Sequence, residues 1–152
     1  MADDEEGGKA ADASEIIAQY QTSRIRALWT SYKRIFQLTK TGICTLDPSN
    51  FKVTNSLSYD EIQKLAPDPK DEDQFTFVAK GTTYQFKTAH RNQMLCQFFE
   101  CASKATRSYL FVGPMRVQRL RKTGIRVESQ ISMAAYGLVE TNEAGVVLQV
   151  YR

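Results

Sequence analysis

The spacing of the apolar residues changes from a strand period to a helical period at Thr88, and that change limits the fold more than any other feature. Before Thr88, short runs of aromatic and branched residues alternate with polar residues between turns, a pattern typical of β-strands. After Thr88 the apolar residues recur on one helical stripe. Hairpin-length connections imply antiparallel pairing. The sequence therefore predicts an α+β fold, mainly β, in which an antiparallel sheet or small barrel is capped by a C-terminal amphipathic helix.

Turn residues set the limits of the expected elements. Asp47-Pro48-Ser49-Asn50 and Lys80-Gly81 are turn sequences, and the run 66–73, with two prolines and four acidic residues, is predicted to be an exposed loop. The spacing of Ile16, Ile17 and Tyr20 predicts a short helix before the strands. We expect a helix at 14–25, strands at 28–38, 43–46, 51–57, 58–65, 74–79 and 82–87, and the capping helix from 88 to about 104, its stripe formed by Met94, Leu95, Phe98, Phe99 and Ala102.

Charge divides the chain into a tail and a body. Residues 1–13 carry a net charge of −4, which predicts a disordered acidic tail, whereas the other residues carry +7 and suit anionic partners such as lipid headgroups. We expect one domain at 14–106. Residues 107–152 are interpreted as a linker and the truncated start of a second domain, with strands at 127–139 and 146–151. A lone hairpin is marginal in water, so pairing with the first domain is the alternative.

Composition narrows the location and the class of protein. No stretch approaches the ~20 apolar residues that span a bilayer, so any membrane contact should be peripheral. The N-terminal sequence lacks the basic start and apolar run of a secretory signal, and we expect a cytoplasmic protein. Cys44, Cys96 and Cys101 are odd in number and form no C-x-x-C pair. They are interpreted as buried thiols, with neither a disulfide framework nor a zinc site.

The sequence offers no support for catalysis. His90 is the only histidine and lies on the polar side of the predicted helix, so neither a Cys–His pair nor a Ser–His–Asp set can be argued. Gly-rich phosphate loops are absent, and the acidic run 71–73 lacks calcium-loop spacing. We therefore expect a binding module rather than an enzyme, with no metal and no cofactor.

Basic residues gather around the first predicted strand and the turn that follows it, beside the only tryptophan. Arginine forms bidentate bonds to phosphate, lysine supplies a point charge, and an exposed tryptophan can lie at the interfacial level of a bilayer. This combination predicts a lipid phosphate site. The alternative is that the charges are solvated at strand edges and that the tryptophan packs in the core. The candidates are Arg24, Arg26, Trp29, Lys33, Arg34 and Lys40.

A second basic run follows the predicted capping helix. It lacks stacking aromatic residues at strand spacing, and no recognised nucleic-acid motif surrounds it. We interpret it as a solvated segment between domains, and a second lipid patch or a nucleic-acid patch is the alternative. The run comprises Arg116, Arg119, Arg121, Lys122 and Arg126.

Several short motifs follow one another in an order that is similar to one known family. They are Tyr32-Lys33-Arg34-Ile35-Phe36, Asp47-Pro48, Val53-Thr54-Asn55, Tyr59-Asp60-Glu61-Ile62 and Phe86-Lys87-Thr88-Ala89-His90-Arg91. Together they resemble the N-terminal repeat of the large endosomal DnaJ-domain co-chaperones of receptor-mediated endocytosis, over about 20–104. Arg91 follows His90, so the His-Pro-Asp motif of a J-domain is absent here.

The resemblance implies a pleckstrin-homology-like fold that binds phosphatidylinositol 3-phosphate and holds the protein peripherally on early endosome membranes for membrane trafficking. The family's lipid-binding residues correspond here to Arg26, Trp29 and Tyr32, with Arg24 as a second candidate. Only Thr30 and Ser31 separate Trp29 from Tyr32, one residue fewer than in the family, so Trp29 points either to solvent or into the core.

The same resemblance bears on the rest of the chain and on its partners. It implies that residues 107–152 begin a second pleckstrin-homology-like repeat. It also implies an anionic phosphoinositide as the main partner and endosomal sorting proteins as partners of the full-length chain, and no nucleic acid is expected. The fold class leaves one alternative, a protein-interaction module of the phosphotyrosine-binding type, in which a peptide adds a strand to the sheet edge.

Overall fold

The computed structural model describes residues 12, 15–27, 30–105, 112–134, 137–142, 144 and 146–151. The first seven strands are β1 (Ile16–Ile25), β2 (Ser31–Thr39), β3 (Gly42–Leu46), β4 (Val53–Ser58), β5 (Ile62–Pro67), β6 (Gln74–Ala79) and β7 (Thr82–Lys87). A 3₁₀ turn, Tyr59–Glu61, joins β4 to β5, and helix α1 (Arg91–Ala105) follows β7. The remaining strands are β8 (Val112–Leu120), β9 (Arg126–Ala134), β10 (Gly137–Thr141) and β11 (Val147–Tyr151).

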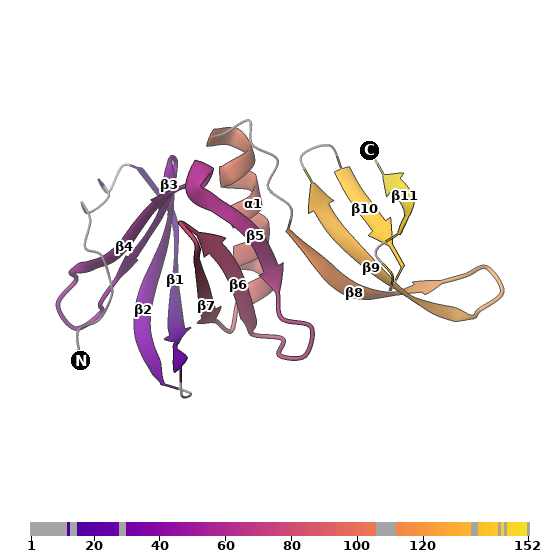
Figure 1. Ribbon diagram of the computed structural model, residues 1–152, viewed down its shortest axis with the longest axis horizontal. Coiled ribbons are helices and arrows are strands. Elements are labelled where there is room, and N and C mark those ends of the chain that lie inside the picture. Colours follow the sequence, from indigo (N-terminus) through magenta and orange to yellow (C-terminus); the bar gives the residue numbers. More distant parts are fainter. Residues whose placement is uncertain are drawn as a thin grey trace.

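Strand pairing sets the shape of the N-terminal body. Its strands follow the order β5-β6-β7-β1-β2-β3-β4, and each neighbouring pair is antiparallel. Strand β1 pairs with β2 along its length and with β7 near its own end, so it joins the β1–β4 meander to the β5–β7 strands (Figure 1). The expected mainly β fold with one helix after the sheet is confirmed.

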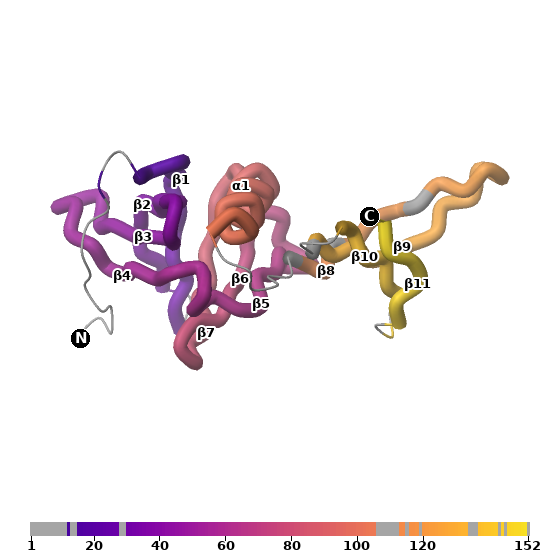
Figure 2. Tube along the Cα trace, turned by 90° about the horizontal axis from the view of Figure 1, so that it is seen from above, coloured from indigo at the N-terminus to yellow at the C-terminus, as the bar shows by residue number. Residues whose placement is uncertain are grey.

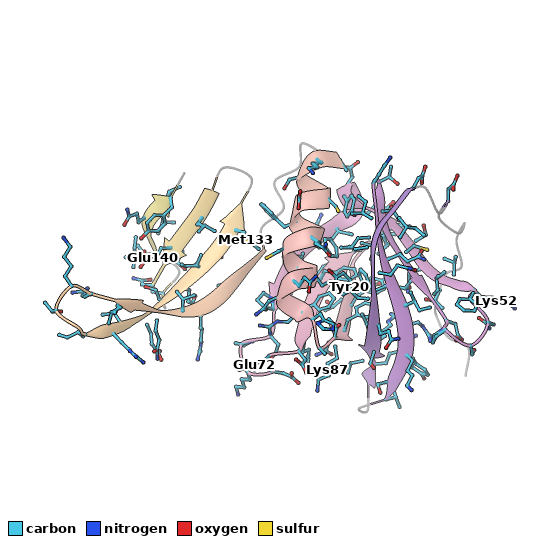
Figure 3. The ribbon with its side chains drawn as sticks, turned by 180° about the vertical axis from the view of Figure 1, so that it is seen from behind. Tyr20, Lys52, Glu72, Lys87, Met133 and Glu140 are labelled. Carbon is cyan, nitrogen blue, oxygen red and sulfur yellow. The ribbon has the colours of Figure 1, made fainter. Side chains whose placement is uncertain are left out.

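Inward-facing aromatic residues fill the core of this body. Phe36 is fully buried, and its ring centroid lies 5.1 Å from that of Phe86 and 6.1 Å from that of Phe98 on α1. The hydroxyl of Tyr20 on β1 donates to Oε1 of Gln97 on α1, where Figure 3 shows Tyr20 close to the helix. The buried residues of α1 are Met94, Leu95, Phe98, Cys101 and Ala102. The predicted apolar stripe therefore packs against the sheet, and Phe99, which is partly buried, lies against the edge of the hydrophobic core.

The first helix predicted from the sequence is wrong, because the segment forms strand β1. Tyr20, Thr22 and Arg24 alternate toward the interior and are 6–8% exposed, while the residues between them are more open to solvent. Two of these three interior positions hold polar side chains, which hides the period of two. The hydroxyl of Thr22 is satisfied inside the sheet, since Oγ1 donates to Arg34 O at 3.0 Å.

Smaller corrections concern element limits and one cysteine. The predicted strand 58–65 begins instead as the 3₁₀ turn, and β5 continues through Pro67, so the loop spans only 68–73. Cys44 and Cys101 are buried as expected, whereas Cys96 is exposed on the polar side of α1. The predicted acidic tail lies almost wholly outside the described residues.

The second basic run spans the end of β8, the turn after it and the start of β9, so it is paired in a hairpin. Arg116, Arg121, Lys122 and Arg126 are exposed, as the interpretation of a solvated segment expects. Strands β8 to β11 form an antiparallel meander, which joins the first body where β8 runs parallel to β5 with Leu65 opposite Val112. The single strand predicted at 127–139 is two strands, β9 and β10. Figures 1 and 2 show this meander beside the first body, with the β8–β9 hairpin extending outward. Its assignment as the start of a second repeat stays a prediction.

Candidate phosphate-binding site

The register of β1 with its two neighbours brings basic residues of three strands together. Ser23 lies opposite Lys33 of β2 on one side and opposite Lys87 of β7 on the other. Directly paired residues of antiparallel strands point to the same face, so these three side chains form one row across the outer face of the sheet. Adjacent strands are about 5 Å apart, which places the two lysine backbones about 10 Å apart. We refer to these residues as the Lys33–Ser23–Lys87 row.

The row borders a pocket of about 480 Å³ between the β3–β4 turn and the β5–β6 loop. This volume is in the range of ~300–1,000 Å³ that is typical of small-molecule sites. Two ammonium groups and the hydroxyls of Ser23 and Thr88 can donate hydrogen bonds, which suits phosphate and sugar oxygens. The lining residues that matter here are Ser23, Lys33, Pro48, Asp73, Lys87 and Thr88.

Two arginines lie on the opposite, interior side of the same strands. Arg24 and Arg34 are each only 6% exposed. The guanidinium of Arg24 lies 4.9 Å from the ring centroid of Tyr84, and that of Arg34 lies 5.4 Å from the ring centroid of Tyr32. Nη1 of Arg34 also donates to Lys33 O at 2.8 Å. The aromatic faces favour these positive charges close behind the row.

Acidic neighbours limit the positive charge of the pocket. Nζ of Lys87 lies 2.8 Å from Oδ2 of Asp71, and this hydrogen-bonded pair raises the pKa of Lys87 and lowers the pKa of Asp71. Lys87 is therefore cationic throughout the neutral range. Figure 3 shows Lys87 beside the loop that carries Glu72. Asp73 adds a carboxylate to the lining. A ligand with few phosphates suits this balance better than a highly charged one.

The loop that carries these acids is fixed to the start of α1. Nη1 of Arg91 donates to the carbonyl oxygens of Asp68, Asp71 and Gln74 at 3.2, 2.8 and 3.2 Å. Thr88 N also donates to Asp73 O at 2.9 Å. The far wall of the pocket is consequently held by backbone contacts, which pre-organises the position of Lys87.

The structure gathers most of the predicted site residues but not all of them. Arg26 follows β1 directly, and its N–H donates to Thr30 O at 2.8 Å to close the β1–β2 turn. Trp29 lies outside the described residues. Lys40 lies in the turn after β2, roughly 20 Å from Lys33 along the strand. Arg24, Arg26, Tyr32, Lys33 and Arg34 thus lie at one end of the β1–β2 hairpin, and Lys40 lies at the other.

Two residues of this region escaped the sequence analysis. Lys87 is more than fifty positions from Lys33, and only the pairing of β1 with β7 brings the two together. Phe51, in the β3–β4 turn at the same end of the sheet, is 69% exposed, which is unusual for a phenylalanine. Lys52 follows it at the outer end of that turn (Figure 3). The end that carries the basic residues also presents an apolar side chain to solvent.

Comparison with known protein families identifies the N-terminal body. Residues 22–105, more than half of the chain, match the family described as the N-terminal domain of the DNAJ protein RME-8. The chain belongs to this family. The resemblance drawn from the short motifs is therefore confirmed. No match was found among curated proteins.

Solved structures show the fold independently. The C-terminal domain of an unknown protein from Leishmania infantum has a TM-score of 0.52 and 14% identity, covering 59% of this chain and 86% of that one. A complex of human RhoA with the DH/PH fragment of PDZRHOGEF gives a TM-score of 0.51 and 12% identity, covering 58% of this chain and 28% of that one. At these identities the likeness shows the fold alone, which is pleckstrin-homology-like. None of the helices in the described part is long and apolar enough to cross a membrane.

Proposed function

We propose that this chain is a phosphoinositide-binding module that recruits an endosomal co-chaperone to early endosome membranes, with phosphatidylinositol 3-phosphate as its lipid. The observation that carries the proposal is the Lys33–Ser23–Lys87 row, which places two cations and a hydroxyl along one pocket of about 480 Å³. Family membership and the fold support the same function.

The pocket suits a headgroup with one phosphate monoester. The ammonium groups of Lys33 and Lys87 bind the monoester oxygens, and the hydroxyls of Ser23 and Thr88 donate to the inositol ring. Arg34, which also lines the pocket, and Arg24 behind it add positive potential. The carboxylates of Asp71 and Asp73 repel additional phosphates, and this repulsion favours a monophosphorylated lipid.

The same end of the sheet faces the bilayer in this proposal. Trp29 and Phe51 enter the interfacial region, and Arg26 and Tyr32 contact the headgroup layer. Four basic residues acting only as surface charge would supply ~4 kcal/mol, which is roughly millimolar affinity. Bonds to the headgroup inside the pocket must therefore supply both the selectivity and most of the useful affinity.

Sedimentation with vesicles tests the proposal. We expect neutral vesicles that contain phosphatidylinositol 3-phosphate to bind the chain, and vesicles that carry the 4- or 5-phosphate isomer to bind it less. Lys33→Ala and Lys87→Ala should each weaken this binding about tenfold or more, whereas Lys104→Ala, which removes an equal charge from α1, should not. Equal sedimentation with vesicles that lack phosphoinositide, or wild-type binding by both site variants, would overturn the proposal.

Lipid binding is preferred over peptide binding for a structural reason. In the phosphotyrosine-binding type of module, a peptide adds a strand to an open sheet edge. Strand β5 meets the chain's own β8 at that edge, where Leu65 lies opposite Val112. The β5 edge of the first sheet is thus partly paired already, whereas the pocket beside the Lys33–Ser23–Lys87 row is open.

A further inference from the structure

The hairpin of β8 and β9 reaches away from the rest of the molecule. Antiparallel pairing continues up to the turn, where Leu120, the last residue of β8, lies opposite Arg126, the first residue of β9. Two backbone hydrogen bonds close the turn, from Arg121 N to Ile125 O and from Gly124 N to Arg121 O, both at 2.9 Å. Figures 1 and 2 show the turn as the part of the hairpin farthest from α1 and the first sheet. The hairpin tip, defined as residues 120–126, is therefore an ordered projection.

This tip combines two features that rarely occur together on a soluble surface. Leu120 is 67% exposed and Ile125 is 62% exposed. Arg121, Lys122 and Arg126 are exposed around them. The nearest acidic residue along either strand is Glu128, so the surroundings of the two apolar side chains are strongly positive. Exposed apolar groups ringed by cations match the layered chemistry of an anionic bilayer, with charge outside and hydrocarbon beneath.

We propose that the hairpin tip is a second membrane contact, specific for anionic bilayers but not for any one headgroup. Leu120 and Ile125 enter the headgroup–acyl boundary, while the guanidinium and ammonium groups of Arg121, Lys122 and Arg126 bind lipid phosphates and carboxylates. The contact does not depend on phosphoinositide binding at the Lys33–Ser23–Lys87 row. A chain that used both contacts would gain avidity, because the second binding event becomes intramolecular.

The chemistry of the tip favours lipid over nucleic acid. Proteins that bind single strands stack bases on aromatic side chains, and residues 120–126 include no aromatic residue. A phosphate backbone would pair with the cations but would leave Leu120 and Ile125 in water. A bilayer accepts both groups at once.

The experiment measures binding to vesicles of phosphatidylcholine and phosphatidylserine that hold no phosphoinositide. Each basic residue near such a surface changes affinity about fivefold, so Arg121→Ala combined with Lys122→Ala should weaken partitioning about 30-fold. The matched control, Lys70→Ala combined with Lys104→Ala, removes the same charge elsewhere and should change it less than about threefold. Equal losses in the two double variants would overturn the proposal, because only general charge would then matter.

A fluorescent reporter tests insertion itself. Tryptophan replaces Ile125 at the tip in one variant and Leu148, which is 56% exposed on β11, in a control variant. After subtraction of the parent signal, emission of the Ile125→Trp chain should shift to the blue on phosphatidylserine vesicles, and that of Leu148→Trp should not. No shift at the tip, or a shift only with a single-stranded oligonucleotide, would overturn the proposal.

Different variants distinguish the proposed contact at the hairpin tip from the one at the Lys33–Ser23–Lys87 row. Lys33→Ala combined with Lys87→Ala should abolish the response to phosphatidylinositol 3-phosphate in neutral vesicles, but it should leave in place the blue shift of the Ile125→Trp chain on phosphatidylserine vesicles. Arg121→Ala combined with Lys122→Ala should weaken binding to phosphatidylserine vesicles and keep the response to phosphatidylinositol 3-phosphate in neutral vesicles. If the tip variant binds phosphatidylserine vesicles as the parent does, the tip proposal fails whatever happens at the row.

Discussion

Replacing Arg91 with methionine removes the guanidinium that holds the β5–β6 loop and keeps a long apolar stem. Nη1 of Arg91 lies 2.8 Å from Asp71 O, and 3.2 Å from both Asp68 O and Gln74 O. This nitrogen carries two hydrogens, so Asp71 O takes one of them and the two longer contacts share the other. The three contacts therefore amount to about two charge-assisted hydrogen bonds.

The cost of Arg91→Met follows from that count. A hydrogen bond to a charged group contributes about 1.5–3 kcal/mol, and the freed carbonyls lie near solvent and can bind water. We therefore expect a loss of about 2–3 kcal/mol in the free energy of unfolding, below the sum of two full bonds. Urea titration, followed by fluorescence and circular dichroism, measures this loss, provided that the slope against urea matches that of the parent.

Lys104→Met is the matched control, because Lys104 lies on the same helix and pairs at 2.9 Å with Glu100, and both side chains are largely exposed. Little change is expected there, since exposed pairs add little to stability. A loss below about 0.5 kcal/mol for Arg91→Met would show that the guanidinium of Arg91 does not hold the loop. The loop would then be held by its own turns, in which Oδ1 of Asp68 accepts from Lys70 N and Asp71 N at 2.8 Å.

Three further predictions concern the core, one ion pair and the thiols. Phe36→Ala empties a fully buried ring site and should lower the free energy of unfolding by about 3–5 kcal/mol in urea titrations; a loss under about 1 kcal/mol would contradict the described core. The ion pair with Lys87 lowers the pKa of Asp71 below its ordinary value of 3.8. The pair therefore stabilises the fold at pH values above 3.8, and this stabilisation is lost as the pH falls through the lowered pKa. The stability difference between the parent and Lys87→Met should therefore shrink below about pH 4, and a constant difference would argue against the pair. Iodoacetamide should modify Cys96 in the native chain but spare Cys44 and Cys101, because those two thiols are buried. Burial also raises the pKa of the Cys101 thiol, which slows its reaction further. Mass spectrometry that finds Cys101 labelled as fast as Cys96 would contradict this prediction.

The strands from β2 to β7 and the helix could be predicted because local patterns dominate there. Tyr84 and Phe86 alternate inward, and Met94, Leu95 and Phe98 keep helical spacing, so burial and local preference agree. Strands β1 and β8 could not be recognised in the same way. Thr22 and Arg24 occupy interior positions of β1, where a hydroxyl bond and an aromatic face replace apolar packing. The sequence shows that these residues are polar, but it does not show the partners that satisfy them in the folded sheet.

The candidate site shows a second limit of the sequence. Alternation in β7 indicates that Lys87 faces outward, but no local signal tells which strand lies beside β7. The pairing of β7 with β1, at Ser23, is a property of the closed sheet. Lys40 is grouped with Lys33 because the two are close in the sequence, although the length of β2 separates them.

Headgroup binding in the pocket is tested by titrating the chain with soluble inositol 1,3-bisphosphate, the headgroup of phosphatidylinositol 3-phosphate, and following the amide chemical shifts. Binding in the pocket predicts saturable shifts that concentrate at Ser23, Lys33, Lys87 and Thr88 and that disappear in Lys33→Ala combined with Lys87→Ala. Lys104→Ala should keep them. Shifts that are absent, or that spread over basic residues at random and do not saturate, would contradict headgroup recognition by the Lys33–Ser23–Lys87 row.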